Sequence, residues 1–548
     1  MRCAMLQCDT KVGDITGNAA HILDLALEAV GQGAELCITP ELALSGYPPR
    51  DLLLYPAFVG AVERAAQDLA KAMSGLGVAL VLGAVGKNPG GDGKPLHNQA
   101  LFLHGGKVLA RYNKRLLPFY DVFDEDRYFE PGDAPCVVTY KGRRIALTIC
   151  EDIWNDGAFW PIRNYALDPL ECSRPFDLLV NLSASPFTLG KQGMREAMVA
   201  SLARKYAAPV LYTNLVGGND DLIFDGRSLC VMPDGSITAR GKAFEHDLVL
   251  CDIAAGTGPV AEDDFAPESE TWRALTLGVR DYCRKSGLRK AVLGLSGGVD
   301  SSLTAAIACE ALGPGQVLGA LMPSPYSSDH SVADAQELAR NLGIKTVTLP
   351  IHEAMRAHDA ILAPVFAGLA PDATEENLQA RIRGTLLMAL SNKFGAMLLT
   401  TGNKSEMSVG YCTIYGDMCG GLAVIGDVYK TEVFSICRWL NEKKGDVIPE
   451  RVLTKAPSAE LRPGQKDQDS LPPYDKLDAI LKDLLEKRMG AQDICAAGHK
   501  PETVRHVATL VKNAEFKRRQ AAPVLKITGN AFGMGWRMPI ACNQAYVL

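Results

Sequence analysis

The pattern of apolar residues changes once along this 548-residue chain, and the change predicts two domains. Residues 254–270 (AAGTGPVAEDDFAPESE) are mostly small, acidic or proline, and no apolar period survives in them. Such a segment is typical of a linker between compact domains. We therefore predict a first domain over residues 1–253, a linker over residues 254–270 and a second domain over residues 271–548, which a chain of this length accommodates.

Both domains are predicted to be of the α/β class, with different architectures. The first mixes strand–helix units with hairpins, one of them at Gly105-Gly106, which favours a layered α/β sandwich over a simple parallel sheet. After the linker, strand-like and helix-like blocks alternate regularly, which predicts a doubly wound parallel sheet. Ligands of such a sheet are expected beyond the carboxyl ends of its strands.

Composition excludes several classes of function. Lys and Arg number 57 against 63 Asp and Glu, and a net charge of −6 excludes a strongly basic nucleic-acid binder and gives no polybasic membrane signal. The 15 cysteines include no C-x-x-C pair, which argues against a disulfide framework or a zinc ribbon. The start of the chain has no signal-peptide pattern, and the longest apolar run, near residues 78–85, is too short to span a membrane. We expect a cytoplasmic protein that binds neither nucleic acid nor a membrane.

A serine- and glycine-rich loop follows a predicted strand in the second domain and opens a predicted helix. In this context backbone N–H groups and the helix dipole bind phosphate, and the glycines let the backbone approach the anion. The serines offer hydroxyl donors, Asp300 can hold Mg²⁺, and no Walker A lysine is present. The alternative interpretation is a tight turn without a ligand. The loop consists of Leu295, Ser296, Gly297, Gly298, Val299, Asp300, Ser301 and Ser302.

The loop resembles the SGG-x-DS loop of the ATP pyrophosphatases, enzymes that cleave ATP to AMP and pyrophosphate. A second polar stretch, TTGNKSE, leaves another buried strand, and its Glu406 could share Mg²⁺ with Asp300, although a solvated loop is the alternative. With ENLQARIRG, YGD, YKTEV and PSAEL, these motifs resemble the NAD synthetases from about residue 268 to the C-terminus. The resemblance implies that the loop residues, Thr401, Lys430 and Ser458 bind ATP, and that deamido-NAD is bound by Asn377, Arg383, Lys404, Glu406, Asp417 and Lys517.

Three polar residues of the first domain each follow a predicted strand. Cys150 ends an apolar strand, Glu41 follows a second and Lys114 follows a third, so the three groups can converge at one edge of a sheet. A cysteine nucleophile needs a base, and no histidine is well placed by motif, which leaves a carboxylate as the candidate. Taken alone, Cys150 could also be a buried structural thiol.

The order Glu, Lys, Cys resembles the nitrilase/amidase superfamily over residues 1–253, through PELALSGYPPRDLL, YNKRLLPFYDVFDEDRYFEPG and CEDIW. The resemblance implies an αββα sandwich, with Glu41 as general base, Lys114 stabilising the tetrahedral oxyanion and Cys150 as nucleophile. Glutamine would acylate Cys150 and release ammonia. The glutamine-contacting residues that the resemblance implies are Tyr120, Glu151, Ser185 and Lys191.

Together the two halves resemble the glutamine-dependent NAD synthetases, which complete NAD biosynthesis. The family implies that the deamido-NAD carboxylate is adenylated by ATP with Mg²⁺ and that ammonia displaces AMP. Because ammonia is mostly protonated at pH 7 and NH₄⁺ is no nucleophile, we also predict a closed passage that carries it between the two sites. The family also implies a homo-oligomer built on a synthetase-domain dimer. GMP and asparagine synthetases share the ATP loop, but the first use a Cys-His-Glu glutaminase and the second an N-terminal cysteine, whereas here Arg2 follows Met1. A synthetase that uses free ammonia beside an inactive amidase domain is the other alternative.

Overall fold

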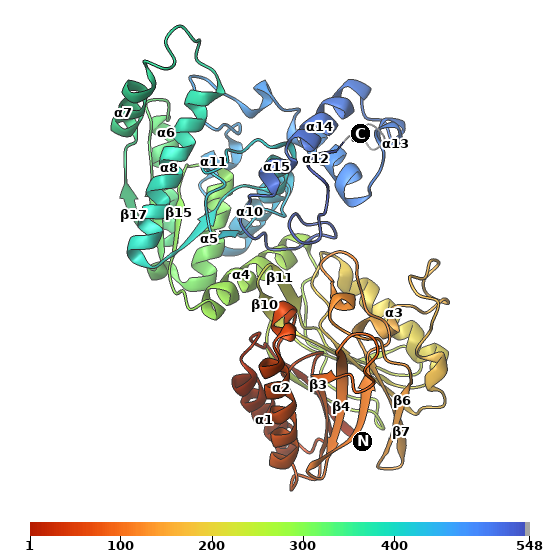
Figure 1. Cartoon of the computed structure of the whole chain (residues 1–548). Helices are drawn as coiled ribbons and strands as arrows, with labels where there is room; N and C mark the ends of the chain where they lie inside the picture. Colours follow the sequence, from red (N-terminus) through yellow and green to blue (C-terminus); the bar gives the residue numbers. More distant parts are fainter. Residues whose placement is uncertain (543–548) are drawn as a thin grey trace. The chain divides into compact units, whose positions relative to one another are not determined.

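The computed structural model describes residues 1–542, which form two compact units, residues 1–265 and the chain from Ala266 onward (Figure 1). The boundary falls inside the segment predicted as a linker. However, helix α4 (Pro267–Lys285) begins before that segment ends, so residues 267–270 are helical. Proline at the first helical position and Glu268 and Glu270 in the first turn favour a helix start, although the same residues look like linker by composition.

The first unit contains two six-stranded sheets and a small hairpin of β10 (Val216–Asn219) and β11 (Leu222–Asp225). The first sheet has the order β14 (Asp247–Asp252), β1 (Arg2–Gln7), β2 (Leu36–Ile38), β3 (Ala79–Lys87), β4 (Leu96–His104) and β5 (Lys107–Asn113). The second has the order β13 (Ile237–Arg240), β12 (Leu229–Val231), β9 (Val210–Asn214), β8 (Leu178–Ser183), β7 (Arg143–Ile149) and β6 (Cys136–Tyr140).

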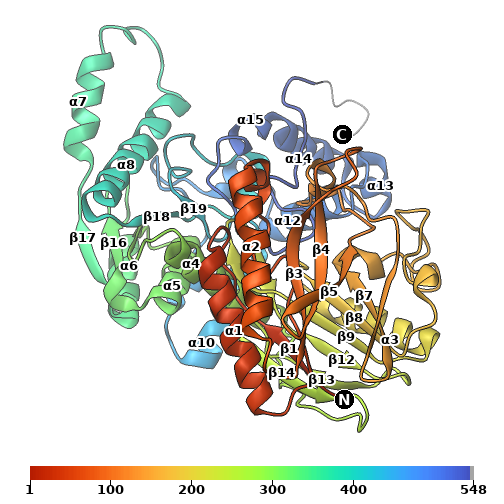
Figure 2. The ribbon, with the colours of Figure 1, turned by 60° about the horizontal axis from the view of Figure 1, so that its bottom comes forward.

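Helices cover the outer faces of both sheets. Helices α1 (Ile15–Gly31) and α2 (Pro56–Ala72) lie side by side against the first sheet (Figure 2). Helix α3 (Lys191–Tyr206) packs on the second sheet. Between the sheets, apolar side chains such as Met5, Ile38, Leu147 and Val180 form one buried cluster. The predicted αββα sandwich is therefore confirmed, as is the hairpin predicted at Gly105-Gly106, which β4 and β5 form.

The second unit is built on one sheet in which every strand is parallel to its neighbours. Its order is β17 (Lys345–Thr348), β16 (Val317–Leu321), β15 (Ala291–Gly294), β18 (Met397–Thr400) and β19 (Leu422–Ala423). The strand order reverses between β15 and β18, and this switch point is where open α/β sheets bind ligands. The predicted doubly wound parallel sheet is confirmed.

Helices fill the connections of this sheet. Helix α5 (Val299–Leu312) follows β15, and the short helix α9 (Lys404–Val409) follows β18, so both helices begin beside the switch point. The remaining connecting helices are α6 (Asp329–Leu342), α7 (His352–Leu362) and α8 (Ala373–Phe394), and α10 (Lys430–Lys444) and α11 (Glu450–Thr454) follow the last strand, β19.

The C-terminal part adds a helical layer for which the sequence analysis made no prediction. It contains α12 (Tyr474–Leu481), a π-helical turn (Lys482–Glu486), α13 (Ala491–Ala496), α14 (Pro501–Asn513) and α15 (Glu515–Arg518). A segment then returns to the sheet, where Val524 bridges Ala423 in parallel, and Val524 and Phe532 join the core of this layer. Within residues 1–542, no helix is both long enough and apolar enough to cross a membrane.

Candidate functional site

Glu41 and Lys114 meet at one edge of the first sheet. They follow β2 and β5, which run in the same direction, so both residues leave the sheet at the carboxyl ends of their strands. Lys114 Nζ donates to Glu41 Oε1 at 2.6 Å, and both side chains are fully buried. Glu41 Oε1 also accepts from Asn98 Nδ2 at 2.7 Å, and its Oε2 accepts from the N–H of Ala184 at 3.0 Å. The carboxylate is therefore held in one orientation.

A second carboxylate, Glu125, shares the same ammonium group. Lys114 Nζ donates to its two oxygens at 2.9 and 2.8 Å, and the hydroxyl of Tyr47 donates to it at 2.9 Å. Burial lowers the pKa of Lys114, but Glu125 and Glu41 outweigh burial and raise that pKa well above its usual value. The sequence analysis missed Glu125 because it lies in a run of acidic residues, and no pattern there shows which one points inward.

Cys150 stands where β7 ends and a short 3₁₀ helix (Cys150–Ile153) begins. Its backbone has φ +41°, a left-handed conformation that is uncommon for residues other than glycine and is found at functional sites. The side chain is 4% exposed. Burial and the charge of Glu41 raise the pKa of the thiol well above its usual value, while Lys114 lowers it. The resting thiol is therefore protonated at neutral pH, and attack requires a base.

Asp152 ties the segment that carries Lys114 to the turn that carries Cys150. Its Oδ1 accepts from the N–H groups of Arg115 at 3.1 Å and Leu116 at 2.9 Å. Its Oδ2 accepts from the N–H of Ile149 and from the hydroxyl of Tyr112, at 2.9 and 2.8 Å. One buried carboxylate thus fixes the exits of both strands, a role that the sequence analysis did not assign.

Two of the residues predicted to contact glutamine, Tyr120 and Glu151, lie close enough to Cys150 to interact with it electrostatically. The hydroxyl of Tyr120 donates to Glu151 at 2.9 Å, and burial raises the pKa of the Glu151 carboxyl. Ser185 is buried beside Ala184, which contacts Glu41, and the N–H of Ser185 donates to Asn214 at 3.0 Å. Lys191 donates to the carbonyl of Pro186 at 3.0 Å, and its ammonium lies 5.3 Å from the ring centre of Trp154.

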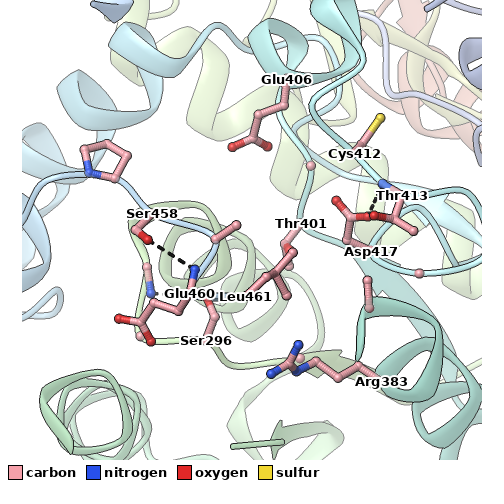
Figure 3. A pocket seen from close by; sticks show the side chains of 18 of the residues that line it. Ser296, Arg383, Thr401, Glu406, Cys412, Thr413, Asp417, Ser458, Glu460 and Leu461 are labelled. Carbon is pink, nitrogen blue, oxygen red and sulfur yellow. Dashed lines mark hydrogen bonds between the residues drawn. The ribbon is translucent and has the colours of Figure 1, made fainter. Parts of the chain in front are cut away.

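The second unit holds a cavity of about 480 Å³ at the switch point of its sheet (Figure 3). It is lined by the loop after β15, the exit of β18, helix α8 and residues 455–461. Most residues predicted to bind ATP or deamido-NAD line it; Asp300, Ser301, Ser302 and Lys404 are not among its lining residues. The predicted residues that line the cavity are Leu295, Ser296, Gly297, Gly298, Val299, Asn377, Arg383, Thr401, Glu406, Asp417, Lys430, Ser458 and Lys517.

The loop between β15 and α5 is held by its own hydroxyl groups. Ser301 and Ser302 both donate to the carbonyl of Gly298, at 3.0 and 2.8 Å, instead of pointing into the cavity. Gly297 has φ +75°, and a Cβ there would lie 2.2 Å from the carbonyl oxygen of Ser331 in helix α6, so no larger residue fits. The Ser296 hydroxyl is also engaged within the loop, since it lies 3.1 Å from the Ser301 hydroxyl and accepts from the N–H of Gly298 at 3.2 Å.

An acidic pair and a lysine lie next to this loop. Lys430 Nζ donates to Asp300 Oδ2 at 2.5 Å and to Glu406 Oε1 at 3.2 Å. Asn403 Nδ2 donates to the other oxygen of Asp300 at 2.9 Å. Burial raises the pKa of Glu406 to about 8, against the effect of Lys430, and the two carboxyl groups raise the pKa of Lys430.

The two carboxylates fit the Mg²⁺ that the sequence analysis assigns to them. Asp300 and Glu406 both reach one ammonium group, so they are close enough to share a cation. Within residues 1–542, no group of three or more His, Cys, Asp and Glu side chains could hold a metal ion. Mg²⁺ in nucleotide sites is bound by one or two carboxylates together with phosphate oxygens and water, which matches this donor set.

Arg383, Asn377 and Asp417, which are predicted to bind the dinucleotide, also line the cavity. Arg383 donates to the carbonyl of Met322 at 3.1 Å, and burial lowers its pKa to about 10, while Glu460 raises it. Asp417 accepts from the N–H of Thr413 at 2.6 Å (Figure 3), and the Thr413 hydroxyl donates to Asn377 at 2.8 Å. The guanidinium of Arg383, which is buried and only weakly paired, is suited to attract an anion.

Comparison with known proteins agrees with the division of the chain into two units. Residues 2–261 match the carbon-nitrogen hydrolase family, and residues 271–521 match the NAD synthase family. A glutamine-dependent NAD(+) synthetase from Synechocystis sp. is 52% identical over 98% of both chains, and one from Thermotoga maritima is 43% identical over 98% of both. The chain belongs to the glutamine-dependent NAD(+) synthetase family.

A solved structure supports the membership. The glutamine-dependent NAD+ synthetase from Acinetobacter baumannii, determined in complex with adenosine diphosphate, is 40% identical, and the match covers 98% of each chain with a TM-score of 0.76. The resemblances inferred from the Glu-Lys-Cys order and the SGG loop are therefore confirmed at the level of the family. The role of each site residue remains a proposal.

Proposed function

We propose that the chain makes NAD from deamido-NAD, ATP and glutamine. The first unit hydrolyses glutamine to glutamate and ammonia, and the second uses that ammonia to amidate deamido-NAD. One observation supports the proposal most strongly. The same chain contains a buried Glu-Lys-Cys centre and a nucleotide-sized cavity at a sheet switch point, and it matches its relatives over 98% of its length.

In the first unit, Cys150 acts as the nucleophile and Glu41 as its base. The thiol attacks the side-chain carbonyl of glutamine while its proton passes to Glu41. Lys114, kept protonated by its two carboxylates, stabilises the negative oxygen of the tetrahedral intermediate. Glu41 then protonates the departing ammonia, and water attacking with its help releases glutamate from the thioester. Tyr120, Glu151, Ser185 and Lys191 orient glutamine.

In the second unit, the dinucleotide is activated before it is amidated. The deamido-NAD carboxylate attacks the α-phosphorus of ATP, the bond to the β-phosphate oxygen breaks, and pyrophosphate leaves. Ammonia then attacks the acyl carbon, and AMP departs. The loop at residues 295–302, with Thr401, Lys430 and Ser458, holds ATP, and Lys430 supplies positive charge beside the phosphates. Deamido-NAD is bound by Asn377, Arg383, Glu406, Asp417 and Lys517.

Mg²⁺ belongs to this proposal as the partner of ATP. Asp300 and Glu406 would hold it, and it would neutralise charge that develops on the phosphates. The family resemblance also suggests a homo-oligomer built on a dimer of synthetase domains, and a cytoplasmic location.

A substrate screen tests the proposal. Purified protein is incubated with ATP, Mg²⁺ and deamido-NAD, and with either glutamine or ammonium as nitrogen donor. AMP, pyrophosphate and NAD are quantified together. We expect AMP and NAD in equal amounts with both donors, and none without Mg²⁺. Cleavage of ATP to ADP, or turnover that does not depend on deamido-NAD, would contradict the proposal.

A further inference from the structure

Lys404 is a charged residue buried within the second unit, away from the cavity that the motif around it helps to line. It begins helix α9, between Asn403 and Ser405, and its side chain is fully buried. The sequence analysis assigned it to deamido-NAD, but it does not line the cavity. A buried ammonium group needs partners, so its contacts indicate what it does.

Those partners come from three segments of the chain, at Asp427, at Glu486 and at residues 528–530. Lys404 Nζ lies 2.8 Å from Asp427 Oδ1 and forms an ion pair with Glu486 of the π-helical turn. It also donates to the hydroxyl of Thr528 at 2.7 Å and to the carbonyl of Asn530 at 3.1 Å. Burial lowers the pKa of Lys404, but the two carboxylates outweigh burial and raise it.

The same carboxylates also hold the returning C-terminal segment directly. Asp427 Oδ2 accepts from the N–H groups of Ile527 and Thr528, both at 2.7 Å, and its Oδ1 accepts from the Thr528 hydroxyl at 2.9 Å. Glu486 accepts from the N–H of Asn530 at 3.2 Å. This segment lies beyond residues 271–521, the range that matches the NAD synthase family.

The neighbours of Lys404 in the chain point the other way, to the acidic pair beside the cavity. Asn403 donates to Asp300, and Glu406 accepts from Lys430. The hydroxyl of Ser405 accepts from the N–H of Lys430 at 2.8 Å, at the start of helix α10. A shift of Lys404 would therefore move Asp300, Glu406 and Lys430 relative to one another.

We propose that Lys404 is a positioning residue of the synthetase reaction, which anchors the Asn403–Glu406 turn to the C-terminal segment at Thr528 and Asn530. The segment thereby becomes part of the catalytic architecture without touching substrate. The inference rests on the proposed function, because it concerns the same reaction. Its effect is expected on the chemical step, where a misplacement of about 1 Å is enough to cost roughly 100-fold in rate.

The test uses the full chain and the ammonium-driven formation of AMP and NAD, at a temperature where circular dichroism shows each variant fully folded. Lys404→Met is expected to lower kcat about 100-fold. Thr528→Val, which keeps the shape and loses the hydroxyl, is expected to lower kcat roughly 10-fold. Thr528→Ser, which keeps the hydroxyl, should restore kcat to within about twofold of wild type.

A matched control separates positioning from stability. Asp334 is a buried carboxylate in helix α6 that pairs with Arg451 at 2.7 Å and does not line the cavity. Asp334→Asn should lower the melting temperature and leave kcat unchanged. Glutamine hydrolysis should be unchanged in all four variants.

The outcomes are distinct. If folded Lys404→Met and Thr528→Val keep the wild-type kcat, the residue is only structural and the inference is wrong. If Thr528→Ser is as slow as Thr528→Val, the hydroxyl contact is not what matters, and the inference is wrong as well. If Lys404→Met does not fold, the Thr528 pair decides. If the wild-type protein forms no AMP and NAD, it is the proposed function that fails.

Discussion

Two lysines in this molecule have the same kind of partners but different surroundings. Lys114 and Lys430 each hold an ammonium group between two carboxylates, Glu41 and Glu125 in one case and Asp300 and Glu406 in the other. Around Lys114 the two carboxylates are 0% and 6% exposed. Around Lys430 they are 17% and 15% exposed, and the lysine lines the cavity of about 480 Å³.

The difference fits the ligand proposed for each site. The first centre is complete before a ligand arrives, because every oxygen of Glu41 and Glu125 already accepts a hydrogen bond from the protein. The second centre keeps one side open, so phosphate oxygens and a metal ion can join the existing charges. Under the proposed function, a small amide binds to a complete set of groups, whereas a nucleotide and its cation would complete the second set.

The largest expected effect separates the two centres completely. Cys150→Ala should abolish synthesis driven by glutamine, because no thioester can form without the sulfur. Synthesis driven by ammonium should remain within about twofold of wild type, since the second centre is untouched. NAD formation with each donor measures both. If a folded variant loses both activities, or keeps both, then glutamine hydrolysis and NAD synthesis are not divided between the two centres in this way.

The second-largest effect is expected when Lys114 loses the charge of one of its two carboxylate partners. Glu125→Gln keeps the volume but removes a negative charge, and we expect glutaminase kcat to fall by roughly 100-fold, in the range of a misplaced catalytic group. Asp126→Asn is the matched control, because Asp126 is an exposed neighbour that pairs with Lys94 at 2.6 Å. Equal activity in the two variants would mean that Glu125 has no part in the centre.

The smallest expected effect is on stability, and it compares the free energy of unfolding lost when each lysine is replaced. Lys114→Met leaves two buried carboxylates without a counter-ion and should lower the free energy of unfolding of its unit by about 3–5 kcal/mol. Lys430→Met should cost less, roughly 1–2 kcal/mol, because the cavity lets water reach Asp300 and Glu406. Denaturant titration of each variant measures both values. A larger loss for Lys430→Met would reverse the comparison.

Position at strand ends made much of the molecule predictable. Cys150 and Glu41 each follow an apolar strand and Lys114 follows the second strand of a hairpin, and a strand exit is where a polar side chain meets a site, so their convergence could be inferred. The strand–loop–helix pattern around Gly297 likewise predicted a phosphate-binding loop, and the regular alternation of strands and helices predicted the parallel sheet.

Contacts between distant segments were not predictable in the same way. Glu125 cannot be told from its acidic neighbours, since only the folded path of residues 114–129 turns it inward. The assignment of Lys404 to deamido-NAD rests on the expectation that a polar residue in a site motif faces the ligand, whereas in the fold its ammonium group pairs with Asp427 and Glu486 in the core. Neither partner is near it in the sequence.

The Asp152 carboxylate has a consequence for how the first centre tolerates motion. The Asp152 carboxylate accepts hydrogen bonds from the backbone of Leu116 and of Ile149, which lie close in the chain to Lys114 and Cys150 respectively. It therefore links the segments that carry the Cys150 sulfur and the Lys114 ammonium group into one rigid unit. Breathing of the two sheets against each other would displace both groups together and leave their separation unchanged. The spacing between nucleophile and cation is thus set locally, by a side chain three positions from Ile149, and not by the accuracy with which two six-stranded sheets are stacked.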